Sequence, residues 1–393
     1  MFWVRCLSKV LSLSGVRSPK SSADDGAFSR QCRNSRPGIP DELRTKDGLR
    51  IRDSGILQSK LSTNPSMQIL CAPTAFKETL TAAEAASIMA RATGGTPLPV
   101  ADGGDGTLDA LEAAIGGRRV RRRVTGPLGD PVDSEMLLGP GVAVIEMASA
   151  SGLKLVPPAR RNPLVTRTWG VGELMRAAWP RRIWLGVGGS ATVDGGLGAL
   201  ATLGVLGPRP DPRGLAIIRR TTVLCDVTTK FLDAPRIFGP QKGATPRMVR
   251  QMEEWFRRWA AMLPRDIRNL ASSGAAGGLS GGLAAFGARL VPGAEFILKA
   301  ARFDRRARAA DLILTGEGKF DRTSLVGKAP GEVIAAARRM KIPVAVVCGR
   351  WALKNRPPGV VAVAVSPDPK RARTGVARAA GEAVAKARRT LGR

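Results

Sequence analysis

The feature that most constrains the fold is an apolar segment that leads into a glycine-rich loop and then into a second apolar segment. Residues 183–187 are typical of a buried strand, residues 188–196 read GGSATVDGG, and residues 197–205 are typical of a helix. Glycines let backbone N–H groups approach an anion closely, and the helix points the positive end of its dipole to the same place. The pattern predicts either a phosphate-binding loop or a glycine turn that is capped at a helix start.

Three further apolar segments end in loops rich in glycine, carboxylates and lysines. Residues 312–314 lead into TGEGKFD and then GKAP, residues 223–225 lead to Asp226, and residues 99–100 lead into ADGGDGT. Ligands of open α/β sheets bind outside the carboxyl ends of the strands. We therefore expect these loops to assemble one site rather than four separate solvated turns.

Strand-like and helix-like segments alternate along the chain. Strands are predicted at 68–72, 142–147, 183–187, 310–314 and 344–347, and helices at 82–92, 107–114, 173–178, 248–262 and 332–340. Such alternation predicts an α/β fold with a largely parallel sheet and right-handed crossovers.

Composition restricts the chemistry that the chain can perform. The 393 residues include no histidine, so acid–base steps fall to Asp, Glu, Lys or water, and phosphoryl transfer suits that limit because positioning and charge neutralisation dominate it. The net charge of +30 is spread along the chain, and aromatic residues total 4% with no tyrosine. A basic surface that attracts anionic substrates is therefore favoured over a nucleic-acid-binding protein. No apolar run approaches the roughly 20 residues of a membrane span.

Two regions bear on where the protein resides. Cys71, Cys225 and Cys348 lie in strand-like segments, which indicates buried free thiols and a reducing, cytoplasmic compartment. Residues 1–66 are rich in Ser, Arg and Pro, and the first 23 contain no acid. They are interpreted as a disordered extension ahead of a true start at Met67, or as an organellar transit peptide.

From Met67 onward the chain resembles the bacterial-type glycerate kinases, which phosphorylate glycerate with ATP. The resemblance rests on long ordered strings: APTAFKETL at 72–80, ADGGDGT at 101–107, VIEMASASGL at 144–153, RNPL at 161–164, the 188–196 loop, FGPQKGAT at 238–245, GAAGGL at 274–279, and residues 315–330. It implies a Rossmann-like domain of residues 67–123 and 303–393, and an inserted α/β domain of residues 124–302. The junctions near Arg123 and Phe303 fall in basic sequence that is typical of loops. The active site is expected in the cleft between the domains, and a homodimer is left open.

The resemblance and the loop chemistry together predict a mechanism. A hydroxyl of glycerate attacks the γ-phosphate of MgATP, with Asp194 orienting or deprotonating it, and 2-phosphoglycerate forms. The phosphate oxygens are expected at Gly188, Gly189, Ser190 and Thr192. The charge that develops on the transferred group, or the substrate carboxylate, is expected to be neutralised by Lys77, Lys242 and Lys328. Magnesium is expected at Glu317 and Asp321, together with Asp102 or Asp226.

Several of these residues could instead have a structural or surface role. Each lysine could be a solvated surface charge, and Asp102 and Asp105 could each stabilise a turn or act as a ligand. Glu146 could be a buried structural acid.

The chain also departs from the family pattern. The family usually has Asp-Ser where this chain has Thr74-Ala75, and Asn where it has Val193. Both changes remove polar groups from the expected ligand cleft. They motivate the alternative that the chain is a catalytically impaired relative that binds a hydroxy acid or a nucleotide.

Overall fold

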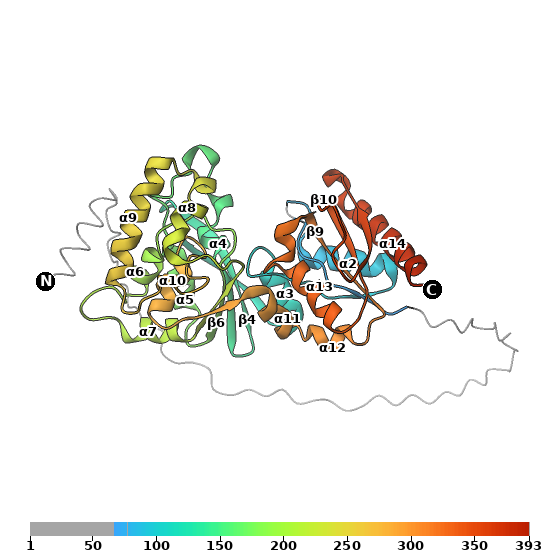
Figure 1. The fold of residues 1–393 in the computed structure, drawn as a ribbon. Helices are drawn as coiled ribbons and strands as arrows, with labels where there is room; N and C mark the ends of the chain where they lie inside the picture. Colours follow the sequence, from blue (N-terminus) through green and yellow to red (C-terminus); the bar gives the residue numbers. More distant parts are fainter. Residues whose placement is uncertain (1–66, 77, 393) are drawn as a thin grey trace, which may run out of the picture.

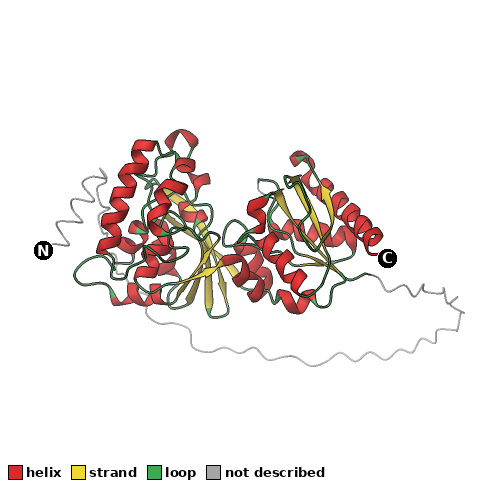
Figure 2. Cartoon of the chain, in the orientation of Figure 1, coloured by secondary structure: helices red, strands yellow, loops and turns green. Residues whose placement is uncertain are grey.

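The computed structural model describes residues 67–76 and 78–392, which form two α/β lobes (Figure 1, Figure 2). The predicted α/β fold is confirmed, because each lobe is a sheet with helices on both faces. The interpretations of residues 1–66 and of Lys77 lie outside the described residues.

The first lobe is built on a fully parallel five-stranded sheet in the order β11-β10-β9-β1-β2. Its strands are β1 (Ile69–Cys71), β2 (Thr96–Pro97), β9 (Leu312–Phe320), β10 (Val344–Trp351) and β11 (Val360–Val365). One face packs against α2 (Ala82–Thr93) and α14 (Ala372–Leu391). The other packs against α11 (Gly293–Ala300), α12 (Phe303–Ala307) and α13 (Ala329–Arg339). The chain reverses its strand order between β1 and β9, the position at which open α/β sheets bind ligands.

The second lobe contains a six-stranded sheet in the order β3-β4-β5-β6-β7-β8, antiparallel up to β5 and parallel beyond it. Its strands are β3 (Arg118–Thr125), β4 (Pro131–Gly139), β5 (Val142–Glu146), β6 (Arg182–Gly186), β7 (Thr221–Cys225) and β8 (Arg289–Pro292). Its helices are α4 (Ala148–Ser151), α5 (Trp169–Ala177), α6 (Leu197–Thr202), α7 (Pro212–Arg219), α8 (Ala234–Phe238), α9 (Pro246–Met262) and α10 (Leu279–Ala285).

Helices α11 and α3 (Thr107–Ile115) join the two lobes. Their apolar side chains form a separate core with residues of β4, β5 and β7. Helix α11 also packs against α13 of the first lobe. The loops that precede and follow these helices are thereby held at the boundary between the lobes.

Local sequence explains where the principal helices begin. Helix α2 starts at a capping box, in which the Thr81 side chain accepts from the Glu84 N–H and the Glu84 side chain accepts from the Thr81 N–H. Helix α9 starts at Thr245 with Pro246 in its first turn, and its apolar face buries Trp259. The predicted helix over 248–262 is confirmed, and Trp255 stacks on Trp259 at a ring distance of 5.9 Å.

The interpretation of residues 118–123 as loop-like is wrong. They belong to β3, the edge strand of the second sheet, where Arg119 binds Asp109, Glu112 and Glu135. The other arginines are exposed, and charges on an edge strand oppose pairing with another chain. Because a junction at Arg123 would cut β3, we propose that the second domain begins before Arg118.

Phe303 is also not in a loop. It starts α12 and is buried in the core of the first lobe. In the described part of the chain, no helix combines the length and the apolar character that a bilayer span requires.

Candidate functional site

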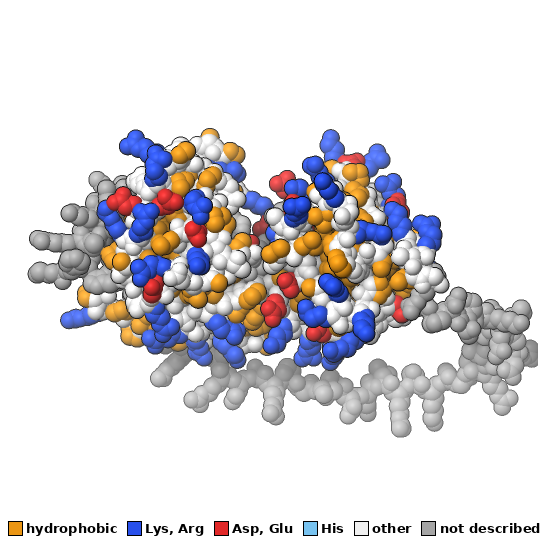
Figure 3. Space-filling view, viewed as in Figure 1, with side chains coloured by type: hydrophobic (Ala, Val, Ile, Leu, Met, Phe, Trp, Pro, Cys, Tyr) orange, Lys and Arg blue, Asp and Glu red, His pale blue; other side chains and the backbone are white. Residues whose placement is uncertain are grey.

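A cavity of about 750 Å³ lies at the carboxyl ends of the strands of the first sheet, facing the second lobe. Figure 3 shows a hollow between the two lobes in the space-filling view. The wall includes Thr74 after β1, Glu317 at the end of β9 and Arg350 at the end of β10. The size is that of a cofactor or substrate pocket, and the place is the strand-order reversal between β1 and β9.

Backbone pairing fixes Thr74 beside the end of β9. The Thr74 N–H donates to the Gly316 carbonyl at 2.9 Å, and its hydroxyl donates to the same oxygen at 3.2 Å. The chain then turns back tightly, because Phe76 and Leu80 exchange backbone hydrogen bonds of 2.9 and 3.0 Å. One wall of the cavity is therefore rigid backbone.

Glu317 is the cavity carboxylate whose surroundings are least complete. Its Oε1 is buried and has no hydrogen-bond partner. Burial raises the pKa of the Glu317 carboxyl, and a hydrogen bond with Ser324 and the charge of Lys328 oppose this shift. A buried carboxylate oxygen without a donor is costly, so a cation bound there would stabilise the site.

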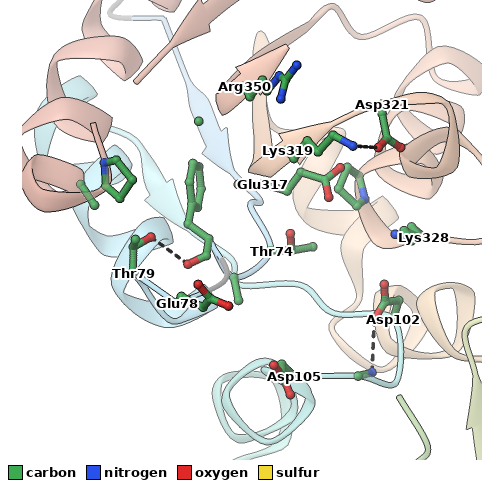
Figure 4. A pocket seen from close by; sticks show the side chains of 18 of the residues that line it. Thr74, Glu78, Thr79, Asp102, Asp105, Glu317, Lys319, Asp321, Lys328 and Arg350 are labelled. Carbon is green, nitrogen blue, oxygen red and sulfur yellow. Dashed lines mark hydrogen bonds and ion pairs between the residues drawn. The ribbon is translucent and has the colours of Figure 1, made fainter. Parts of the chain in front are cut away.

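Asp321 and Lys328 lie close to Glu317 on the same wall (Figure 4). Asp321 accepts from the Thr323 hydroxyl at 2.6 Å and pairs with Lys319 at 2.9 Å. These contacts hold the pKa of Asp321 well below its usual range. Lys328 donates to the Thr323 hydroxyl at 3.3 Å. The carboxylate of Asp321 thus already has hydrogen-bond and ion-pair partners, whereas the Oε1 of Glu317 has none.

The N-terminus of α13 opens onto the cavity. Lys328 is its N-cap, no side chain caps it, and Pro330 in its first turn lines the wall. By contrast, α2 begins in its own capping box. The free N–H groups and dipole of α13 favour an anion beside the Lys328 ammonium.

The second lobe contributes Gly188, Gly189 and Asp226 to the cavity wall, and the 101–105 loop contributes Asp102. A Cβ on Gly188 would lie 2.5 Å from the Gly104 Cα, so glycine permits the two loops to touch. The Asp102 Oδ1 accepts from the Gly104 N–H at 3.2 Å. A Cβ on Gly327 would lie 3.6 Å from the Asp226 carbonyl oxygen, which places Asp226 directly across from the start of α13.

The rest of the 188–196 loop does not line the cavity. Asp194 is 2% exposed, and its Oδ2 accepts from the Thr168 N–H at 2.9 Å, the Thr168 hydroxyl at 2.8 Å and the Gly198 N–H at 3.1 Å. Its Oδ1 accepts from the Gly196 N–H at 3.2 Å. Two of these contacts reach Thr168 at the start of α5 and two reach the start of α6, so the Asp194 carboxylate is held between the two helix starts and its predicted catalytic role stays a prediction.

Lys242, Ser190 and Thr192 form a second internal group. The Lys242 ammonium is buried and donates to the Ser190 hydroxyl at 2.7 Å and the Thr192 carbonyl at 2.8 Å. Burial lowers the pKa of Lys242 to about 7, against the attraction of Asp194 and Asp226. Lys242 thus holds the 188–196 loop through Ser190 and Thr192. The predicted contact of these residues with phosphate stays a prediction.

Glu146 is placed as expected for the alternative of a buried structural acid. Its Oε1 accepts from the Leu108 N–H at 2.8 Å in the first turn of α3, and burial raises its pKa to about 7. Val193 packs in the core of the second lobe, whereas Thr74 lines the cavity. Of these two departures from the family pattern, Thr74-Ala75 changes the cavity wall and Val193 does not.

Sequence reasoning missed several wall residues, among them Glu78, Lys319, Arg350 and Ser366. Arg350 and Ser366 could have been found, because apolar residues 344–347 precede the first and apolar residues 360–365 precede the second, so each stands at a strand end. Glu78 could not, because it lies in the tight turn after β1 with φ of 67°.

The wall carries an excess of negative charge. Its described residues include seven carboxylates and three cations: Glu78, Asp102, Asp105, Asp226, Glu317, Asp321 and Asp368, against Lys319, Lys328 and Arg350. No group of three potential metal ligands forms among the described residues. Mg²⁺ binds through one or two carboxylates plus phosphate and water, so Glu317 fits such an ion without a complete protein cage.

Comparison with known proteins assigns the family. The sequence profile of the glycerate kinase family matches residues 69–212 and 215–391. The chain belongs to the glycerate kinase family. Relatives include a "Glycerate kinase" of Haemophilus influenzae, 39% identical over 324 residues (72% of this chain and 86% of the relative). A "Glycerate 2-kinase" of Escherichia coli is 36% identical over 326 residues, 72% of this chain and 85% of the relative.

The fold agrees with the family assignment. A solved structure named as a glycerate kinase 2 from Salmonella typhimurium LT2 matches with a TM-score of 0.69 and 35% identity. The match covers 84% of this chain and 100% of that one. As a member of the family, the chain is an enzyme, a transferase of the kinase class.

Proposed function

We propose that this enzyme transfers the γ-phosphoryl group of ATP to a hydroxyl of glycerate, giving 2-phosphoglycerate. The observation that carries the proposal is one cavity in which Lys328, the unpartnered Glu317 oxygen and Asp226 of the facing lobe meet. Family membership supports the glycerate substrate, and the name of the Escherichia coli relative supports position 2.

The triphosphate is held at the start of α13. The uncapped N–H groups of that helix and the Lys328 ammonium offer positive charge to phosphate oxygens. The Gly188 and Gly189 backbone faces them from the second lobe. Donors that are fixed before the reaction stabilise developing charge without reorganisation, and removing one of them typically costs about 10²–10³ in rate.

Magnesium would be held by Glu317, because its buried Oε1 has no other partner. When bound, the ion offsets charge on the β- and γ-phosphates. It would also balance the excess of carboxylates on the wall, which opposes the approach of two anionic substrates.

Asp226 is the proposed proton acceptor. The glycerate hydroxyl oxygen forms the new bond to the γ-phosphorus, and the bond to the bridging oxygen breaks, leaving its electron pair on ADP. The hydroxyl proton passes to the carboxylate of Asp226, a residue that lines the cavity and whose backbone carbonyl lies across from Gly327. Asp194 does not take this role, because its carboxylate is enclosed by four donors away from the wall.

The compartment proposed for the reaction is the cytoplasm. Cys71, Cys225 and Cys348 are buried free thiols, and a reducing compartment preserves such groups.

A coupled assay of ADP release with D-glycerate tests the proposal. We expect the parent to release ADP only when glycerate is present, and ³¹P NMR to identify 2-phosphoglycerate. Lys328→Met should lower kcat by about 10²-fold. The matched control Lys299→Met, an exposed lysine on α11, should keep the parent rate.

A second candidate function rests on Thr74, which lines the cavity where the family usually has an acid. In this reading the protein binds a nucleotide or a hydroxy acid without turnover. A parent that binds MgATP but releases no ADP with glycerate would support this candidate and contradict the kinase.

A further inference from the structure

The cavity has two chemically different ends. The end near β9 and α13 carries Glu317, Asp321 and Lys328. The opposite end carries the apolar side chains of the cavity wall, which are Phe76, Pro367, Pro369, Ala372 and Val376, with the polar residues Thr79, Ser366 and Asp368 between them along the chain. A ligand that fills the whole cavity must therefore have one charged end and one apolar end.

The packing of the first lobe keeps the two ends apart. Phe76 and Val376 belong to the core between the sheet and α2 with α14, and Ala372 packs against that core. Helix α13 belongs to the core on the opposite face of the same sheet. The cavity thus crosses the carboxyl edge of the sheet, over the ends of β1 and β9, from one face to the other.

We propose that the apolar end, between Phe76 and the start of α14, is the subsite for the purine base of the nucleotide. This inference rests on the proposed function. Glycerate is a three-carbon acid with no apolar face, so of the two substrates only the nucleotide has a flat surface that gains from burial there. The triphosphate then extends over Gly316 and Gly318 toward Lys328.

The local backbone makes this end preformed. Backbone hydrogen bonds between Phe76 and Leu80 fix Phe76, and the Thr79 hydroxyl donates to the Phe76 carbonyl at 2.8 Å (Figure 4). On the other wall, the Ser366 N–H donates to the Cys348 carbonyl at 2.8 Å, and the Asp368 Oδ1 accepts from the Lys370 N–H at 2.9 Å. A base that enters meets ordered walls, which lowers the cost of binding.

Filling the apolar end tests the inference. Ala372 is partly exposed at the cavity wall, so Ala372→Trp adds an indole where the base is expected, and Ala372→Leu is a smaller second variant. Ala385→Trp, at an exposed position of the same helix, is the matched control. Affinity is measured by calorimetry with MgATP and, as a probe of the charged end alone, with magnesium tripolyphosphate.

In the parent, we expect MgATP to bind at least tenfold more tightly than magnesium tripolyphosphate. Ala372→Trp should weaken MgATP at least tenfold and raise the KM for ATP. It should leave tripolyphosphate affinity and the KM for glycerate at the parent values. Ala372→Leu should act in the same direction to a smaller extent, and Ala385→Trp should change nothing.

Two results overturn the inference while leaving the kinase intact. One is an active parent that binds both ligands equally, and the other is an active Ala372→Trp and Ala372→Leu pair with parent affinity for MgATP. A parent that binds no nucleotide contradicts both the base subsite and the proposed function.

Discussion

The two glycine-rich regions of this chain, residues 188–196 and residues 315–331, resemble each other in sequence and differ in where their polar side chains lie. The first places its carboxylate and hydroxyls inward, where Asp194 accepts four hydrogen bonds and Lys242 holds Ser190. The second leaves the Glu317 Oε1 without a partner and the start of α13 uncapped beside the cavity. The Thr192 Oγ1 of the first region is also buried without a hydrogen-bond partner, but Thr192 does not line the cavity, whereas Glu317 does. The two regions therefore differ in which polar groups reach the cavity wall, and not in their glycine content.

The largest expected effect separates the two aspartates. Asp226→Asn should lower kcat by about 10²–10⁴, because an amide cannot accept the hydroxyl proton. The free energy of unfolding of Asp226→Asn should fall by less than that of Asp194→Asn. Steady-state kinetics and urea unfolding of the same preparation measure both, and a variant with parent kcat would remove Asp226 from the mechanism.

Asp194→Asn should show the reverse behaviour. The amide can satisfy only part of the set of donors from Thr168, Gly196 and Gly198, so the free energy of unfolding should fall by on the order of 3 kcal/mol. The kcat of the folded fraction should stay close to the parent value. A stable but inactive variant would return the catalytic role to Asp194.

Restoring the residues that the family usually has at positions 193 and 74 compares a core position with a cavity position. Val193→Asn places an amide in the core of the second lobe and should destabilise the protein by about 2 kcal/mol without raising kcat. Thr74→Asp changes the cavity wall and should alter the KM for ATP. Thermal unfolding and kinetics of the two variants distinguish a core position from a site position, and a rise in kcat in Val193→Asn would contradict this assignment.

The smallest effect concerns Glu146, whose folded-state pKa of about 7 lies above the ordinary value of 4.5. The folded state then holds a proton that the unfolded state has lost, so the stability that this group contributes is present below pH 4.5 and is lost as the pH rises through about 7. Between pH 6 and pH 7 the loss is about 1 kcal/mol. Glu146→Gln should remove this slope in urea unfolding, and an unchanged slope would place the titration elsewhere.

The sequence predicted the fold well because alternating apolar segments determine parallel βα units. It predicted that strand ends would converge, and Glu317, Asp102 and Asp226 do meet at one cavity. The sequence could not show whether a loop carboxylate lies inside a lobe or on the cavity wall, because Asp194 and Glu317 both stand in glycine-rich segments. The partners that enclose Asp194, such as Thr168, are distant along the chain. Residues 118–123 were misread because arginines conceal the strand pattern of β3 at a sheet edge.

We propose that the nucleotide binds at the start of α13 and not at residues 190–198. Hydrogen exchange measured by mass spectrometry, with and without a non-hydrolysable MgATP analogue, tests it most directly. We predict slower exchange in residues 327–333 and no change in residues 190–198. Slower exchange in residues 190–198 with no change in residues 327–333 would contradict nucleotide binding at the start of α13.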